Sequence, residues 1–65
     1  MYHKLRQLRL QRGISQTFIS KKLGYTYASG YSNIENGRVR LKFDQAKIIA
    51  DILNVPVDEL VDRAI

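Results

Sequence analysis

Cysteine is absent from this chain of 65 residues. No disulfide framework and no thiolate zinc site can therefore stabilise it, and the absence is compatible with a reducing cytosol. A chain of this length makes one domain, expected over residues 1–65, and buries only about 60% of the surface that its unfolded form exposes. We expect a net stability of roughly 3–5 kcal/mol unless a partner or a dimer contact adds to it.

Long apolar runs are absent as well. The longest is Ile48-Ile49-Ala50, whereas a membrane helix needs about 20 apolar residues. Charged residues interrupt the N-terminal stretch MYHKLRQLRLQRG, which lacks the apolar core of a signal peptide. These absences argue against a membrane partner and predict a cytoplasmic protein.

Acidic residues are nearly absent from the first 42 positions. This part holds nine Lys or Arg and a single acid, Glu35, whereas residues 43–65 hold two basic and five acidic residues. The net charge of +5 is therefore unevenly spread along the chain. A positive side attracts polyanions such as nucleic acid, although a solvated basic face kept for solubility would have the same charge count.

A catalytic constellation is also missing. The single histidine, His3, stands near the N-terminus, and the basic half has neither paired carboxylates nor a glycine-rich phosphate loop. Asp58, Glu59 and Asp62 lie close together in sequence, but the positive end of a helix dipole explains acids at a helix start. We expect no enzymatic activity, no cofactor and no metal.

What the sequence does contain is helical periodicity. Leu5 and Leu8 share one face of a first helix, which Gly13 ends. Ser15 is a good N-cap for a second helix at about 16–23, because its hydroxyl can accept from a free backbone N–H. The inward side of that second helix is predicted to consist of Phe18, Ile19 and Leu23.

Three further helices follow. The third, at about 28–36, ends near the turn signal Asn36-Gly37. In the fourth, FDQAKIIADIL, the apolar stripe comprises Phe43, Ala46, Ala50 and Leu53. Pro56 suits the first position of a fifth helix. Since no strand-like alternation occurs, we expect an all-α, compact five-helix bundle.

The ordered motifs resemble the phage-repressor and Cro (Xre-like) family of helix-turn-helix domains. The segments that carry the resemblance are GISQ at the second helix, IENG at the end of the third, IADIL in the fourth and NVPVDEL after it. Each motif alone is weak, but the set in order covers essentially the whole chain.

The resemblance implies that the third helix is a recognition helix in the major groove of double-stranded DNA. Only Tyr31 and Ile34 of that helix should then point inward. The base-reading candidates carried over from the family are Ala28, Ser29, Ser32 and Asn33. Asn33 is the first choice because an asparagine amide can pair bidentately with adenine, whereas Ala28 offers contact only to a thymine methyl.

The resemblance also implies contacts to the DNA backbone. The phosphate-binding candidates are Gln16, Tyr27, Asn36, Arg38, Arg40 and Lys42; the alternative for each basic residue is a solvated surface charge. Tyr25 is expected to pack over the turn instead. In the family, an arginine at the place of Arg9 pairs with the glutamate that ends the third helix, here Glu35, so we expect a structural ion pair between these two residues; the alternative is a DNA-facing role for Arg9.

One departure from the family lies between Gly24 and Glu35, where this chain has one residue more than the usual spacing. The turn around residues 25–27 is the expected place for it. Gly30 leaves two alternatives open: it permits a close backbone approach, or the helix starts late with Ser29 as its cap.

Short regulators of this type bind DNA as two-fold dimers. The candidates for an apolar dimer patch are Ile48, Ile52, Val61 and Ile65; the alternative is that the fifth helix covers them. The sequence thus predicts a DNA-binding transcription regulator, a small repressor that binds a pseudo-palindromic operator. The alternatives are a DNA-binding antitoxin or restriction-controller protein, and a protein-interaction module of the same fold. Control would have to come from protein level or from a regulatory partner protein.

Overall fold

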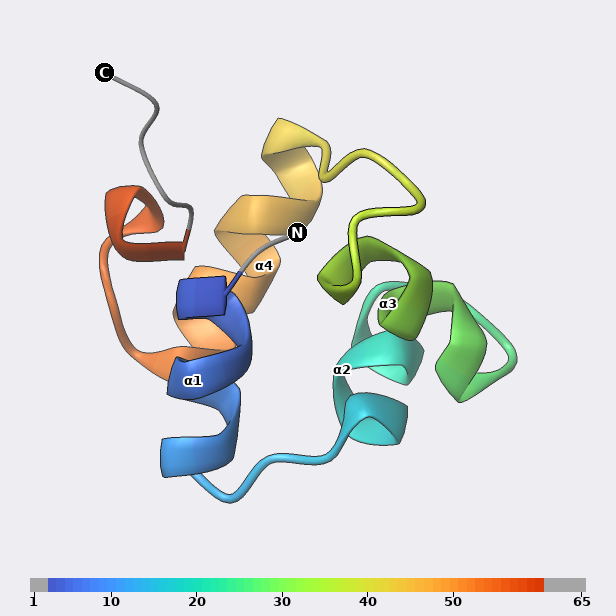
Figure 1. Cartoon of the computed structure of the whole chain (residues 1–65), viewed down its shortest axis with the longest axis horizontal. Helices are drawn as coiled ribbons and strands as arrows, with labels where there is room; N and C mark the ends of the chain where they lie inside the picture. The colour runs from blue at the N-terminus through green and yellow to red at the C-terminus, as the bar shows by residue number, and fades with distance from the viewer. Residues whose placement is uncertain (1–2, 61–65) are drawn as a thin grey trace.

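The computed structural model describes residues 3–60, which fold entirely into helices, turns and loops (Figure 1). The elements in chain order are α1 (His3–Gln11), α2 (Gln16–Lys22), α3 (Ala28–Glu35), α4 (Phe43–Leu53) and the 3-10 helix η1 (Val57–Leu60). No strand occurs among these described residues. The all-α class is therefore as expected, and α2 and α3 begin at the residues that the sequence indicated.

The core is built mainly on α4, whose residues at helical spacing meet one residue from each of the other elements. Its fully or nearly fully buried members are Leu5, Ile19, Tyr31, Ala46, Ile49, Ala50, Leu53 and Leu60. The helices α2 and α3 pack closely on each other, while η1 packs against both α1 and α4. In Figure 1 the α2–α3 pair therefore forms one side of the molecule, and α1, α4 and η1 form the other.

Three sequence expectations about the core and the helix count are wrong. The fifth helix is a single 3-10 turn within the described residues, although Leu60 is fully buried as an inward residue should be. Phe18 and Phe43 are 46% and 68% exposed instead of joining the core. Each ring lies beneath a lysine one turn further on, Lys22 or Lys47, with the ammonium nitrogen 5.4 or 5.7 Å from the ring centroid.

The α2–α3 turn, residues 23–27, fixes the start of α3. Gly24 has a φ of 93°, a conformation that favours glycine, and the next N–H, that of Tyr25, returns to the Ser20 carbonyl at 3.0 Å. Tyr27 is the N-cap of α3, so the alternative of a late start at Ser29 is wrong. That the turn holds the additional residue stays a prediction.

Ser20 supplies the polar contacts that the Tyr27 side chain does not. Tyr27 makes no side-chain capping bond. Instead, the fully buried hydroxyl of Ser20 donates to the Tyr27 carbonyl at 2.5 Å and accepts from the Tyr31 N–H at 3.2 Å. A side chain of α2 thus caps α3 and holds the two helices in register.

At Gly30 the structure shows the close backbone approach that was the other alternative for this glycine. The ring of Tyr25 lies against the α3 backbone at Gly30, so closely that a Cβ at this position would collide with the Cβ, Cγ and Cδ1 of Tyr25. The cost of a glycine inside a helix, about 1 kcal/mol relative to alanine, is therefore offset by the packing of Tyr25.

Candidate nucleic-acid interface

The recognition-helix candidate α3 has two distinct faces. Tyr31 and Ile34 are fully buried, as expected, and Glu35 is only 5% exposed. The other face carries the four proposed base-reading side chains, of which Ser29 is exposed and Ala28, Ser32 and Asn33 are half-buried. Only short, polar or small side chains therefore line the outward surface of this helix.

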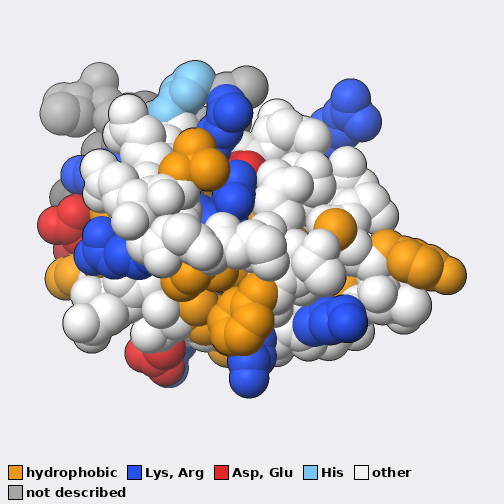
Figure 2. Space-filling view, turned by 90° about the horizontal axis from the view of Figure 1, so that it is seen from below, with side chains coloured by type: hydrophobic (Ala, Val, Ile, Leu, Met, Phe, Trp, Pro, Cys, Tyr) orange, Lys and Arg blue, Asp and Glu red, His pale blue; other side chains and the backbone are white. Residues whose placement is uncertain are grey.

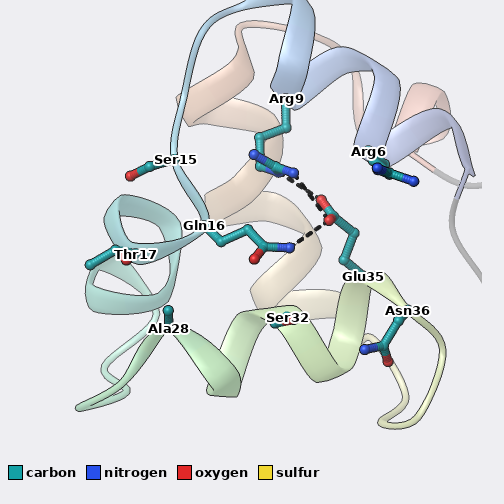
Figure 3. Close-up of a pocket in the computed structure, with 9 residues that line it drawn as sticks. All are labelled: Arg6, Arg9, Ser15, Gln16, Thr17, Ala28, Ser32, Glu35 and Asn36. Carbon is teal, nitrogen blue, oxygen red and sulfur yellow. Dashed lines mark hydrogen bonds and ion pairs between the residues drawn. The ribbon is translucent and has the colours of Figure 1, made fainter.

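A groove of about 580 Å³ runs between α1, the start of α2 and this outward face (Figure 3). Its lining residues are Arg6, Arg9, Ser15, Gln16, Thr17, Ala28, Ser32, Glu35 and Asn36. Ala28, Ser32 and Asn36 follow one another at intervals of four along α3, which places them on one stripe of the helix. Ser29 and Asn33 form a neighbouring stripe and do not line the groove.

The floor of the groove is an ion pair. Arg9 Nε donates to Glu35 Oε1 at 2.7 Å, and Nη2 donates to Oε2 at 3.2 Å, which is a two-pronged geometry (Figure 3). A third donor of the same guanidinium, Nη1, reaches the Ile14 carbonyl at 2.9 Å. Arg9 thus holds α1 to α3 and also holds the segment that leads into α2.

Two more donors converge on Glu35. The Tyr31 hydroxyl donates to Oε1 at 2.9 Å, and Gln16 Nε2 donates to Oε2 at 2.7 Å. Burial alone would raise the pKa of the Glu35 carboxyl, but the hydrogen bonds from Arg9, Gln16 and Tyr31, with the Arg9 charge, together hold it below its ordinary value. Burial and the adjacent carboxylate raise the pKa of Tyr31. Glu35 is therefore ionised and Tyr31 neutral at physiological pH.

The role predicted for Gln16 is modified by this network. Its side-chain amide is hydrogen-bonded to Glu35 and is half-buried. One of its two amide hydrogens is committed, so the second hydrogen and the backbone N–H are what remain for a phosphate oxygen. The bond to Glu35 fixes the orientation of the amide in advance.

The loop that follows α3 carries the other phosphate-binding candidates. Asn36, Arg38, Arg40 and Lys42 are all exposed. The Arg38 N–H donates to the Asn33 carbonyl at 2.9 Å and to Asn36 Oδ1 at 3.2 Å, so the loop is tied to the end of the helix. Tyr27, at the opposite end of α3, is 75% exposed. The candidates thus flank the helix at both ends.

Besides Arg9, two basic residues in the positive part of the chain have partners within the protein. Arg12 Nε donates to the Leu53 carbonyl at the end of α4 at 3.0 Å, and Lys4 pairs with Glu59 at 3.6 Å. The charge count alone therefore overstates the basic surface that is available to a polyanion.

Sequence reasoning missed two polar residues that line the groove, Arg6 and Thr17. Arg6 lies one turn before Arg9 on α1 and is exposed. The spacing of three from Arg9 was a signal that could have placed it on the same side of the helix. Thr17 follows Gln16, and no sequence pattern distinguishes it from its neighbours.

The dimer candidates are only partly brought together. Ile48 is 41% exposed, while Ile52 is half-buried against the core. Ile52 lines a second hollow of about 480 Å³ with Gly13, Ile14, Ser15 and Phe18. Figure 2 shows hydrophobic side chains gathered near the middle of the face seen from below, with Lys and Arg side chains beside them. Val61 and Ile65 lie outside the described residues.

Two helices joined by a tight turn, the second exposing short polar side chains beside a basic loop, define a helix-turn-helix DNA-binding domain. The chain belongs to the Cro/C1-type, Xre-like helix-turn-helix family, because the family model for this domain (HTH_3, Helix-turn-helix) matches residues 5–60. The domain of this family binds DNA and is not catalytic. Neither the curated proteins nor the solved structures compared with the chain gave a match.

Two other properties bear on partners. Among residues 3–60, no helix is long and apolar enough to cross a membrane. Over the same range, no three His, Asp or Glu side chains gather into a group that could hold a metal ion.

Proposed function

We propose that the protein is a sequence-specific transcription regulator, a small repressor that binds a pseudo-palindromic operator in the cytoplasm and blocks access to a promoter. The observation that carries the proposal is the outward face of α3, which presents small and polar side chains while Tyr31, Ile34 and Glu35 secure the helix from behind. Such a face suits base edges, and no core function accounts for it.

The proposed contacts divide into two groups. Asn33 pairs with adenine, Ser29 and Ser32 bond to base edges, and Ala28 meets a thymine methyl. The second group holds the sugar-phosphate backbone and comprises Gln16, Tyr27, Asn36, Arg38, Arg40 and Lys42. These residues lie at the start of α2 and at both ends of α3, so the base-reading residues lie between the two sets of phosphate contacts.

Two copies are proposed to bind half-sites about one helical turn apart. Ile48 is the cleanest test of the interface, because it is exposed whereas Ile52 also packs on the core. The substitution Ile48→Asp should shift sedimentation toward monomer without unfolding the domain, as checked by circular dichroism. An unchanged dimer would remove Ile48 from the interface. Exposed Lys47, the preceding residue on α4, supplies the control variant Lys47→Gln.

The proposal is tested by selecting bound duplexes from a random DNA pool and then measuring affinity at two salt concentrations. Enrichment of a two-fold symmetric site, with log affinity falling linearly as log salt rises, supports a regulator. Salt-sensitive binding without sequence preference would contradict sequence readout and leave an architectural role. Absence of binding would contradict DNA recognition and favour a protein-interaction module.

A further inference from the structure

The side chain of Gln45 makes two hydrogen bonds, one within the start of α4 and one to the turn of the helix-turn-helix unit. Gln45, in the first turn of α4, accepts from the Lys42 N–H through Oε1 at 3.1 Å. The same side chain donates from Nε2 to the Tyr25 hydroxyl oxygen at 2.9 Å. Lys42 is the N-cap of α4 and the last basic residue of the loop after α3. One amide therefore joins the turn before the recognition helix to the loop after it.

Tyr25 is itself held in place from two sides. Its N–H donates to the Ser20 carbonyl on α2 at 3.0 Å. Its ring packs on α3 at Gly30, where a Cβ would collide with it. The phenol is therefore attached to both helices of the helix-turn-helix unit, and the backbone of Lys42 is fixed relative to that unit rather than only to α4.

We infer that Tyr25 and Gln45 are positioning residues for the phosphate contact of Lys42. The inference rests on the proposed function. The Lys42 side chain is exposed, so the free energy of its contact depends on where its backbone is held when DNA binds. Because phosphates carry no sequence information, the two residues act on affinity for every duplex and leave base preference unchanged.

The substitution Tyr25→Phe isolates this role, since it keeps the ring on Gly30 and removes only the acceptor for Gln45. We expect affinity to fall roughly two- to tenfold, the value of one hydrogen bond, equally for the selected site and for unrelated DNA. Gln45→Ala, which removes both bonds, should lower affinity at least as much. In the free protein, hydrogen exchange at the Lys42 amide should accelerate in both variants.

A double-mutant cycle separates positioning from a general loss of stability. If Tyr25 acts through Lys42, then Tyr25→Phe has little further effect on DNA affinity once Lys42→Gln is present. The matched control is Arg38→Gln, whose backbone is anchored to Asn33 and Asn36. In the cycle of Tyr25→Phe with Arg38→Gln, the losses of DNA affinity from the two substitutions should add.

Each result supports or overturns the inference. Additive effects in both cycles, or unchanged hydrogen exchange at the Lys42 amide, would overturn the inference. The proposed function would still stand if the wild-type protein binds DNA. If the wild-type protein shows no salt-dependent DNA binding, the proposed function fails and the inference fails with it. Non-additivity with Lys42 alone, with base preference unchanged, is the supporting result.

Discussion

Gln16 and Glu35 lie 2.7 Å apart from amide nitrogen to carboxylate oxygen, so a proposed phosphate ligand on α2 is anchored to the last residue of the recognition helix. The same carboxylate receives the Arg9 guanidinium and the Tyr31 hydroxyl. Three helices thus meet at one acidic group beneath the proposed DNA-binding surface. Stability and orientation of that surface depend on the same contacts.

Removing one partner of this ion pair should unfold much of the population. Arg9→Met leaves Glu35 buried without its cation, and losses of about 3–5 kcal/mol are typical of such a change. That is as large as the whole stability expected of a domain of this size, roughly 3–5 kcal/mol. Urea unfolding followed by circular dichroism measures the change.

The double variant Arg9→Met/Glu35→Leu should be less damaging than Arg9→Met alone, because no unpaired charge stays buried. The control is Lys4→Ala, which removes the exposed pair with Glu59 and should change stability by under about 1 kcal/mol. Equal losses for the variants at Arg9 and Lys4 would contradict the assigned role of the buried pair.

Acid should destabilise the fold through Glu35. The pKa of this carboxyl is lowered from its ordinary value of 4.5 in the folded protein. A lowered pKa contributes stability that is fully present above pH 4.5 and is lost as the pH falls through the folded-state value. The difference in free energy of unfolding between the wild type and Glu35→Gln should therefore be largest near neutrality and shrink below pH 4.5. A difference independent of pH would refute this account.

Ser20→Ala should cost more stability than its small size suggests. The buried hydroxyl accepts from the Tyr31 N–H and donates to the Tyr27 carbonyl, which keeps its bond from the Gly30 N–H; leaving the buried Tyr31 N–H unpaired costs about 1–3 kcal/mol. Ser15→Ala is the comparison, because it removes the exposed capping bond to the Phe18 N–H, a change worth roughly 0.5–2 kcal/mol. Urea titration of both variants gives the ranking, and a larger loss for Ser15→Ala would reverse the conclusion.

Base and phosphate contacts should separate in DNA-binding measurements. Asn33→Ala should relax one base position and cost about 1–3 kcal/mol against the preferred sequence. Arg40→Gln should weaken binding to all sequences alike and reduce the slope of log affinity against log salt by about one. If Asn33→Ala instead weakened binding to all sequences alike and Arg40→Gln relaxed one base position, the roles assigned to the two residues would have to be exchanged.

Periodicity was sufficient where the determining contacts are local. The cap at Ser15 is set by residues within one turn. Tyr31 and Ile34, which the resemblance placed inward, lie three apart on one helix. Periodicity predicts the direction in which a side chain points. It does not predict whether a neighbouring helix extends far enough to cover that side chain. Phe18 is exposed although the next residue, Ile19, is fully buried, and Phe43 is exposed at the first position of α4.

Contacts between distant residues carried no sequence signal. The bond between Tyr25 and Gln45 joins residues twenty positions apart, and a buried serine at position 20 follows no apolar stripe. The family resemblance supplied the pairing of Arg9 with Glu35, which spacing alone would not have given. Pro56 and the acids mark a helical start, which the structure has at Val57, but they do not distinguish the observed 3-10 turn over Val57–Leu60 from an α-helix.

The division of α3 into a buried and an outward face has a consequence for how such a regulator diversifies. None of the four proposed base-reading side chains is buried, whereas the residues that hold the helix are almost wholly enclosed. If these side chains read bases as proposed, we expect that exchanging them changes the DNA sequence recognised at little energetic cost to folding. New specificities should then be accessible to this scaffold by single substitutions, without compensating changes elsewhere in the chain.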